Sequence, residues 1–198
     1  MSTSFASLVA DVMSLTNRPD LVGETNLAVQ AATLKAHHQD DWIKDLKEYS
    51  IAFSTSDYTQ SLDYKEVLPL WRKPRYLRKY DAAGSAVGRF LDYLEPEQVI
   101  DGYGADRQDI FYVAGSNIQI KSSSPLQYIL LGAYLNPDIT VSGFNSWIAD
   151  DHKFAIIYEA VAIIFKTIGY DEQVPIYREM VKEQMQQLRQ HATTGLGM

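Results

Sequence analysis

The stretch Asp109-Ile110-Phe111-Tyr112-Val113, followed by Ala114-Gly115-Ser116-Asn117 and Ile118-Gln119-Ile120, decides the fold of this chain. β-Branched and aromatic residues on both sides of a short glycine-containing loop predict a β-hairpin. The turn Ser122-Ser123-Ser124-Pro125 then leads into a further apolar run, 127–135, which Asn136-Pro137 ends. The pattern predicts a three-stranded meander in the middle of the chain.

Upstream of the hairpin, weaker strand signals continue toward the N-terminus. Apolar and small residues alternate over 49–53, the cluster 54–57 is typical of a turn, and 89–93 has the composition of a strand. Segment 62–67 fits either a strand or a helical turn. We therefore expect a β insertion over residues 47–141.

The N-terminal part predicts two helices. Large apolar residues from Phe5 to Met13 follow the spacing of one helix face, with Ser4 as a candidate cap, and Pro19 follows its end. A second helix is expected over about 21–37, capped by Asp20. The apolar face of this second helix would consist of Leu27, Ala31 and Leu34, supported by Ala28 and Ala32.

The last third of the chain returns to helical spacing. Residues 150–168 are apolar nearly all round, which predicts a helix buried on every side by its own domain or by a neighbouring subunit. Gly169 is the expected stop, and a final helix with Pro175 in its first turn follows. The tail after residue 191 has no helical pattern.

These patterns together predict a single domain of the α+β class that is mainly α. Residues 1–46 and 144–192 would form a helical bundle, 47–141 a β-sheet or hairpin insertion, and 193–198 a C-terminal arm.

Composition excludes several classes of function. The 198 residues contain no cysteine, which excludes disulfides, thiol catalysis and cysteine-bound metals. Lys and Arg number 18 against 25 Asp and Glu, and a net charge of −7 argues against a protein that wraps nucleic acid. Residues 1–5 lack the features of a signal peptide, so we expect a soluble chain with no membrane partner. The 13 tyrosines suit either strands or protein interfaces.

No motif in the sequence amounts to an active site, so we expect no enzyme, no cofactor and no metal. His37, His38, Asp40 and Asp41 have metal-ligand chemistry, but adjacent helix positions do not face one ion, and the same holds for 150–152. Glu159 lies in the most apolar segment and therefore needs a partner. We predict a structural buried charge, paired with a Lys or Arg in the chain or across a subunit interface.

One segment combines basic and aromatic residues inside the acidic chain. The run from Trp71 to Tyr80 contains five cations, namely Arg72, Lys73, Arg75, Arg78 and Lys79. They could contact nucleic acid transiently, with tyrosines stacking on bases, or meet an acidic patch on a protein. The protein partner is the favoured interpretation.

Several segments resemble one protein family. These segments are Leu15-Thr16-Asn17-Arg18-Pro19-Asp20-Leu21, Glu24-Thr25-Asn26-Leu27-Ala28, Ala32-Thr33-Leu34-Lys35-Ala36-His37, Phe111-Tyr112-Val113-Ala114-Gly115, Ser122-Ser123-Ser124-Pro125 and Ser146-Trp147-Ile148-Ala149-Asp150-Asp151. In this order they resemble the head-to-tail adaptor proteins of tailed bacteriophages, also called connector or head-completion proteins. Residues 57–108 match least.

The resemblance implies a structural virion protein, made in the host cytoplasm and located in the head-tail neck. Such adaptors form a ring, commonly of twelve copies, below the portal protein. The ring continues the channel for double-stranded DNA, which passes without sequence-specific binding, and the β part receives the next tail protein. The C-terminal segment reaches into the portal, which gives a portal-binding role to Thr193, Thr194, Gly195, Leu196, Gly197 and Met198. The alternatives are a small hydrolase using Glu159 or Asp150 and a monomeric protein-binding module.

Overall fold

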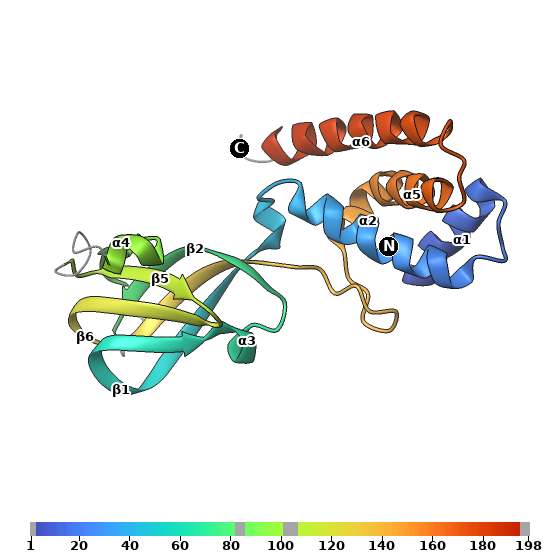
Figure 1. The fold of residues 1–198 in the computed structure, drawn as a ribbon. Coiled ribbons are helices and arrows are strands. Elements are labelled where there is room, and N and C mark those ends of the chain that lie inside the picture. The colour runs from blue at the N-terminus through green and yellow to red at the C-terminus, as the bar shows by residue number, and fades with distance from the viewer. Residues whose placement is uncertain (1–2, 82–85, 101–106, 195–198) are drawn as a thin grey trace. The chain divides into compact units, whose positions relative to one another are not determined.

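A computed structural model describes residues 3–81, 86–100 and 107–194. The chain divides into two compact units (Figure 1). One unit consists of Met1–Asp45 together with Asn136–Met198, and the other of Leu46–Leu135. The second unit is therefore inserted, in sequence, between two parts of the first.

The first unit is helical and is built around one buried helix. It contains α1 (Phe5–Thr16), α2 (Val22–His38), the short 3-10 helix η1 (Ile43–Asp45), α5 (Trp147–Thr167) and α6 (Val174–Thr194). Helices α1, α2 and α6 all pack on α5 (Figure 1). Most of 155–164 is buried, but Phe154 is 44 % exposed, so the predicted burial on every side is not complete. The prediction for α1 is confirmed, since the Ser4 Oγ accepts a hydrogen bond from the Ser7 N–H at 3.2 Å.

The predicted face of α2 is right only in part, because Ala28 and Ala32 are buried as expected but the larger residues are not. The helix buries small and β-branched residues, whereas Leu27 is 68 % exposed, Ala31 is exposed and Leu34 is only half-buried. Small side chains let α2 approach α5 closely, and this close contact decides its orientation. The predicted cap is also wrong, because Leu21 is the N-cap residue and makes no side-chain capping bond.

The ends of α5 and α6 are set by local chemistry. The Ser146 side chain caps α5, and Gly169, with φ 81°, follows its end as predicted. Helix α6 has Pro175 as its second residue and continues to Thr194, so the predicted loss of helix after residue 191 is wrong. Residues 195–198 of the predicted arm lie outside the described residues.

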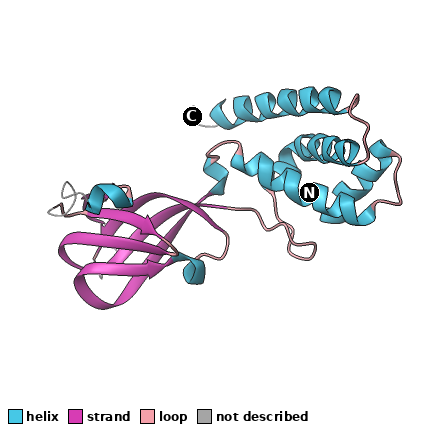
Figure 2. Ribbon diagram, in the orientation of Figure 1, coloured by secondary structure: helices cyan, strands magenta, loops and turns pink. Residues whose placement is uncertain are grey.

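The second unit is a six-stranded sheet (Figure 2). Its strands are β1 (Leu46–Asp63), β2 (Trp71–Tyr80), β3 (Ala86–Phe90), β4 (Asp92–Tyr93), β5 (Ile110–Ala114) and β6 (Asn117–Leu135), with the short helices α3 (Tyr64–Val67) and α4 (Pro96–Ile100). The order is β3-β2-β6-β5-β4, and β1 also pairs with β6. All pairs are antiparallel except β4 with β5.

Strand β6 organises this sheet. It runs without a break through 122–125, where the sequence predicts a turn, so the predicted meander is instead β5 followed by one long strand. Its first half pairs with β5 and its second half with β2, while β1 pairs with both halves. The β5–β6 hairpin is confirmed, with Gly115 at φ 63° in the turn.

The predicted fold class, mainly α with a β insertion, is wrong. The sheet is a complete unit with its own core of buried residues, including Leu77, Phe111 and Leu131. The error comes mainly from 54–57, which is polar and exposed and therefore indicates a turn by composition. In the structure this segment belongs to β1. The parts of β1 before and after it both pair with β6 and keep the segment extended.

Candidate functional site

The predicted basic run forms strand β2, and its five cations do not share one surface. Lys79 is 7 % exposed, ion-paired with Asp109 and 3.1 Å from the Ser123 Oγ, so it lies inside the unit. It follows Leu77 by two positions, and residues two apart on a strand share a face. Lys79 is therefore not available to an external partner.

Three of the other four cations of β2 pack against aromatic rings. The Arg72 guanidinium and the Lys73 Nζ each lie 5.7 Å from the centroid of the Tyr134 ring, and the Arg78 guanidinium lies 5.1 Å from that of Phe90. Arg75 is exposed. A partner that contacts β2 would therefore meet a mixed aromatic and basic surface.

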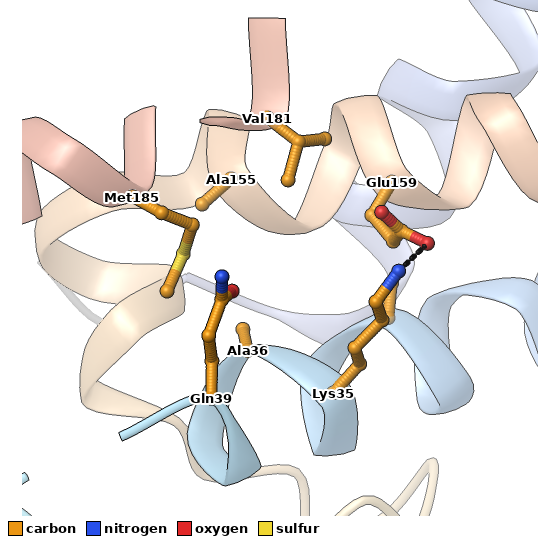
Figure 3. A pocket seen from close by; sticks show the side chains of 8 residues that line it. Lys35, Ala36, Gln39, Ala155, Glu159, Val181 and Met185 are labelled. Atoms are coloured by element: carbon orange, nitrogen blue, oxygen red, sulfur yellow. Dashed lines mark hydrogen bonds and ion pairs between the residues drawn. The ribbon is translucent and has the colours of Figure 1, made fainter. Parts of the chain in front are cut away.

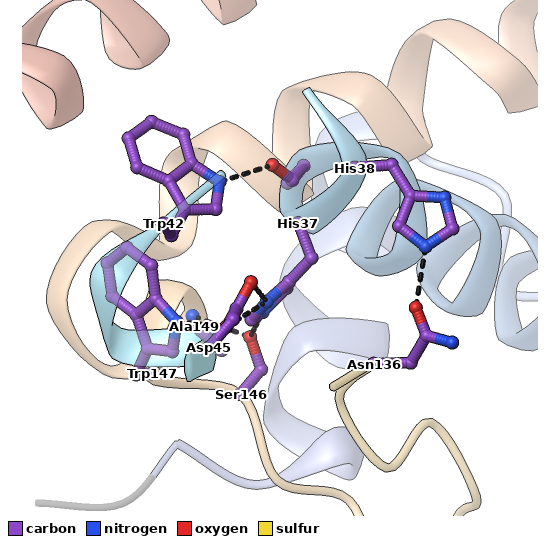
Figure 4. Close-up of polar contacts among 9 residues, drawn as sticks. His37, His38, Trp42, Asp45, Asn136, Ser146, Trp147 and Ala149 are labelled. Carbon is purple, nitrogen blue, oxygen red and sulfur yellow. Dashed lines mark hydrogen bonds and ion pairs between the residues drawn. The ribbon is translucent and has the colours of Figure 1, made fainter. Parts of the chain in front are cut away.

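A buried polar cluster connects three segments of the helical unit (Figure 4). His37, which is 1 % exposed, lies near the end of α2, and its Nδ1 is 2.9 Å from the Asp45 Oδ1. The His37 Nε2 is 2.9 Å from the Ser146 Oγ, and the Trp147 Nε1 donates to the Asp45 Oδ1 at 2.7 Å. No sequence pattern indicates this cluster, because His37 and its partner Ser146 are 109 residues apart.

The order Asp45–His37–Ser146 is that of a serine-hydrolase triad, but its surroundings give it a structural role. A nucleophilic serine must reach a substrate, whereas Ser146 is buried and its Oγ accepts the Ala149 N–H at 3.2 Å as the cap of α5. Trp42 and Trp147 pack edge to face beside it. The cluster therefore fixes the end of α2, η1 and the start of α5 to one another.

Glu159 forms the second buried charge site, on α5. Its Oε1 lies 2.6 Å from the Lys35 Nζ on α2, which supplies a partner from within the same chain (Figure 3). A small pocket lies beside this pair, between α2, α5 and α6, and is lined by apolar side chains such as Val181 and Met185. The pair faces little open space in which a substrate could bind.

The residues with metal-ligand chemistry near the end of α2 are dispersed. The His38 Nε2 is 2.6 Å from the Asn136 Oδ1, and Asp40 is 2.6 Å from the Arg189 Nε. Asp150 and Asp151 bind the Thr3 N–H and Lys44. Within 3–81, 86–100 and 107–194, no three His, Asp or Glu side chains are grouped so as to hold a metal ion.

Two exposed apolar patches lie on the helical unit. The first, the α2 stripe, consists of Leu27, Ala31 and Leu34 and points away from the buried face of α2. The second consists of Ile176 and Met180 on α6. The α2 stripe is the apolar face that the sequence predicts, but the prediction places it in the core of the unit.

Comparisons with models of known protein families and with curated protein sequences find no match for this chain. Among the described residues, no helix is long and apolar enough to span a membrane. The family resemblance therefore depends on the quoted segments alone.

Proposed function

We propose that this chain is a structural protein that assembles side by side into a ring and joins a capsid portal to a tail. The virion role follows from the resemblance of the quoted segments to head-to-tail adaptors. Self-assembly is supported by a separate observation, namely the α2 stripe.

The α2 stripe has the properties of a contact surface. Leu27 is more exposed than any other large apolar residue in the described part of the chain, and it lies opposite the face of α2 that packs in the unit. Ile176 and Met180 form a second, different patch on α6. Head-to-tail rings need two different surfaces on each copy, so that one surface meets the other on the next copy.

The size of the stripe predicts that one contact is weak. Burial of a leucine contributes about 1.5–3 kcal/mol, and the cost of association removes much of this gain. Ring closure gives each copy two contacts, and docking on a preformed portal ring adds many at once. We therefore expect the purified protein to be monomeric and to form rings on its portal protein.

The test compares two substitutions that each add a charge at an exposed apolar residue. Leu27→Asp should abolish ring formation on the portal, seen by negative-stain electron microscopy, and leave thermal unfolding of the monomer unchanged. Ile43→Asp, on η1 and 56 % exposed in the wild type, is the matched control and should still assemble. Rings of Leu27→Asp as abundant as those of the wild type would refute the proposed contact.

The alternative of a hydrolase that uses Glu159 gains no specific support. Such a carboxylate must exchange protons with a substrate, whereas the Glu159 carboxylate is buried and held by Lys35. The other alternative is a monomeric protein-binding module. Such a module would bind its partner through the sheet, so Leu27→Asp would leave that binding unchanged.

A further inference from the structure

A second pair of histidines lies where α5 meets the end of α6. His152 occupies a kink in α5, with φ −142° and ψ 52°, and its side chain is half-buried. His191 lies in the last turn of α6 and is exposed. The His191 Nδ1 is 3.3 Å from the His152 Nε2, and the ring centroids are 5.1 Å apart.

The 3.3 Å between these two nitrogens lies at the long end of the range for a hydrogen bond. The His37 Nδ1 in the same unit is 2.9 Å from its carboxylate partner. Two nitrogens bound to one tetrahedral zinc ion at about 2.0–2.1 Å lie about 3.3–3.4 Å apart. The observed separation is therefore also that of two ligands of a shared metal ion.

The chemistry of the two side chains decides which kind of ion suits this position. Asp151 is adjacent, paired with Lys44 at 2.6 Å, and the chain carries a net charge of −7. Imidazole nitrogens select transition metals over Mg²⁺ and Ca²⁺, which prefer oxygen ligands.

We propose that His152 and His191 bind a divalent transition-metal ion such as Zn²⁺, which links α5 to the end of α6. Two protein ligands leave two positions of a tetrahedral ion to water, so binding is weaker than at a structural zinc site with four protein ligands. The ion would hold the last turn of α6 against α5, whereas the bond between Arg189 and Asp40 links α6 to the segment that follows α2.

Isothermal titration of the full chain with Zn²⁺ at pH 7.5 tests the site. The wild type should bind one ion per chain, and Mg²⁺ should give no heat. Both His191→Ala and His152→Gln should weaken Zn²⁺ binding more than tenfold, since even loss of a residue that only supports a ligand costs about 10–100-fold. His191 is exposed near a helix end, so its variant should fold even if the variant of His152 does not.

His38→Ala is the matched control. His38 is also exposed and near the end of a helix, but its ring contacts Asn136 instead of another histidine. Zn²⁺ binding by this variant should equal that of the wild type. The proposal fails if the wild type shows no binding at millimolar Zn²⁺, if His191→Ala binds as tightly as the wild type, or if His38→Ala weakens binding as much as the other variants.

Discussion

His37 shows how a polar side chain is kept inside an apolar unit. Both of its ring nitrogens have partners, Asp45 and Ser146, and the Asp45 carboxylate gains a further donor from Trp147. Removal of one member leaves the others buried with fewer partners, which costs more than the bond itself contributes. The cluster is therefore sensitive to single substitutions.

His37→Leu should lower the free energy of unfolding by about 2–4 kcal/mol, because it keeps the side-chain volume but removes a partner from the buried Asp45 carboxylate. Urea denaturation followed by circular dichroism measures the change. His38→Leu, at the next position but exposed, should cost less than about 1 kcal/mol. Equal losses in the two variants would show that the cluster contributes nothing specific.

The bond between Lys79 and Asp109 makes the sheet sensitive to acid. Burial alone would raise the pKa of Asp109, but hydrogen bonds from Lys79 and Ser123 outweigh it and bring the pKa below its usual value. A carboxylate with a lowered pKa in the folded state contributes stability above the unfolded pKa of about 3.9, and this contribution is lost as pH falls through the folded value.

Asp109→Asn should therefore destabilise the protein at pH 7 and matter progressively less as pH falls from about 4 through the lowered folded-state pKa, where the wild-type carboxylate also becomes neutral. Asparagine tolerates the left-handed backbone of this position, at φ 61°, so the variant changes charge and not conformation. Thermal unfolding from pH 2.5 to 7 measures the difference. A difference that is constant across this range would contradict the role of the Asp109 charge.

At the scale of elements, the spacing of large apolar residues predicts where helices lie. It does not predict helix contacts that are made by small residues. The Leu and Val spacing places α1 correctly, and the apolar run places α5. The face of α2 is predicted only in part, because the prediction centres on large residues such as Leu27, whereas the small side chains of Ala28 and Ala32 make the close contact. The sequence does not predict β6 as a single strand, because the composition of 122–125 is typical of a turn. Pairing with neighbouring strands before and after this segment keeps it extended.

Gly132 illustrates an element contact that the sequence cannot reveal. The Tyr76 ring crosses over this glycine of β6, from β2 to a hydrogen bond with Glu48 on β1. A Cβ at position 132 would lie within 2.7 Å of three ring atoms. Burial, and next the bond to Glu48, raise the pKa of Tyr76 to about 12.

Gly132→Ala should displace the Tyr76 ring and lower the free energy of unfolding by about 1–3 kcal/mol, the usual cost of overpacking. The pKa of Tyr76, followed by NMR, should fall toward its ordinary value of about 10. Gly23→Ala on α2, where a Cβ meets nothing within 4 Å, is the control and should be neutral or slightly stabilising. An unchanged Tyr76 pKa in Gly132→Ala would rule out the crossing.

At the scale of the whole molecule, the candidate sites depend on contacts between distant parts of the chain. The sequence shows that Glu159 needs a partner, but Lys35 is 124 residues away in sequence. His152 and His191 are 39 residues apart and belong to different helices. The sequence can therefore show which residues need a partner. Which residue becomes that partner is decided by the packing of α2 and α6 on α5.

The path of the chain predicts that the helical unit folds without the sheet. Leu46 pairs with Tyr134 at the start of β1 and the end of β6, so the insertion begins and ends at neighbouring positions, whose Cα atoms lie about 4.5–5.5 Å apart in such a pair. The core of the helical unit, from Phe5 to Leu188, contains no residue of 46–135. Replacement of 46–135 by a Gly-Ser linker of about four residues should leave a helical protein with one cooperative thermal transition. Gradual, non-cooperative melting would mean that the helices depend on the sheet.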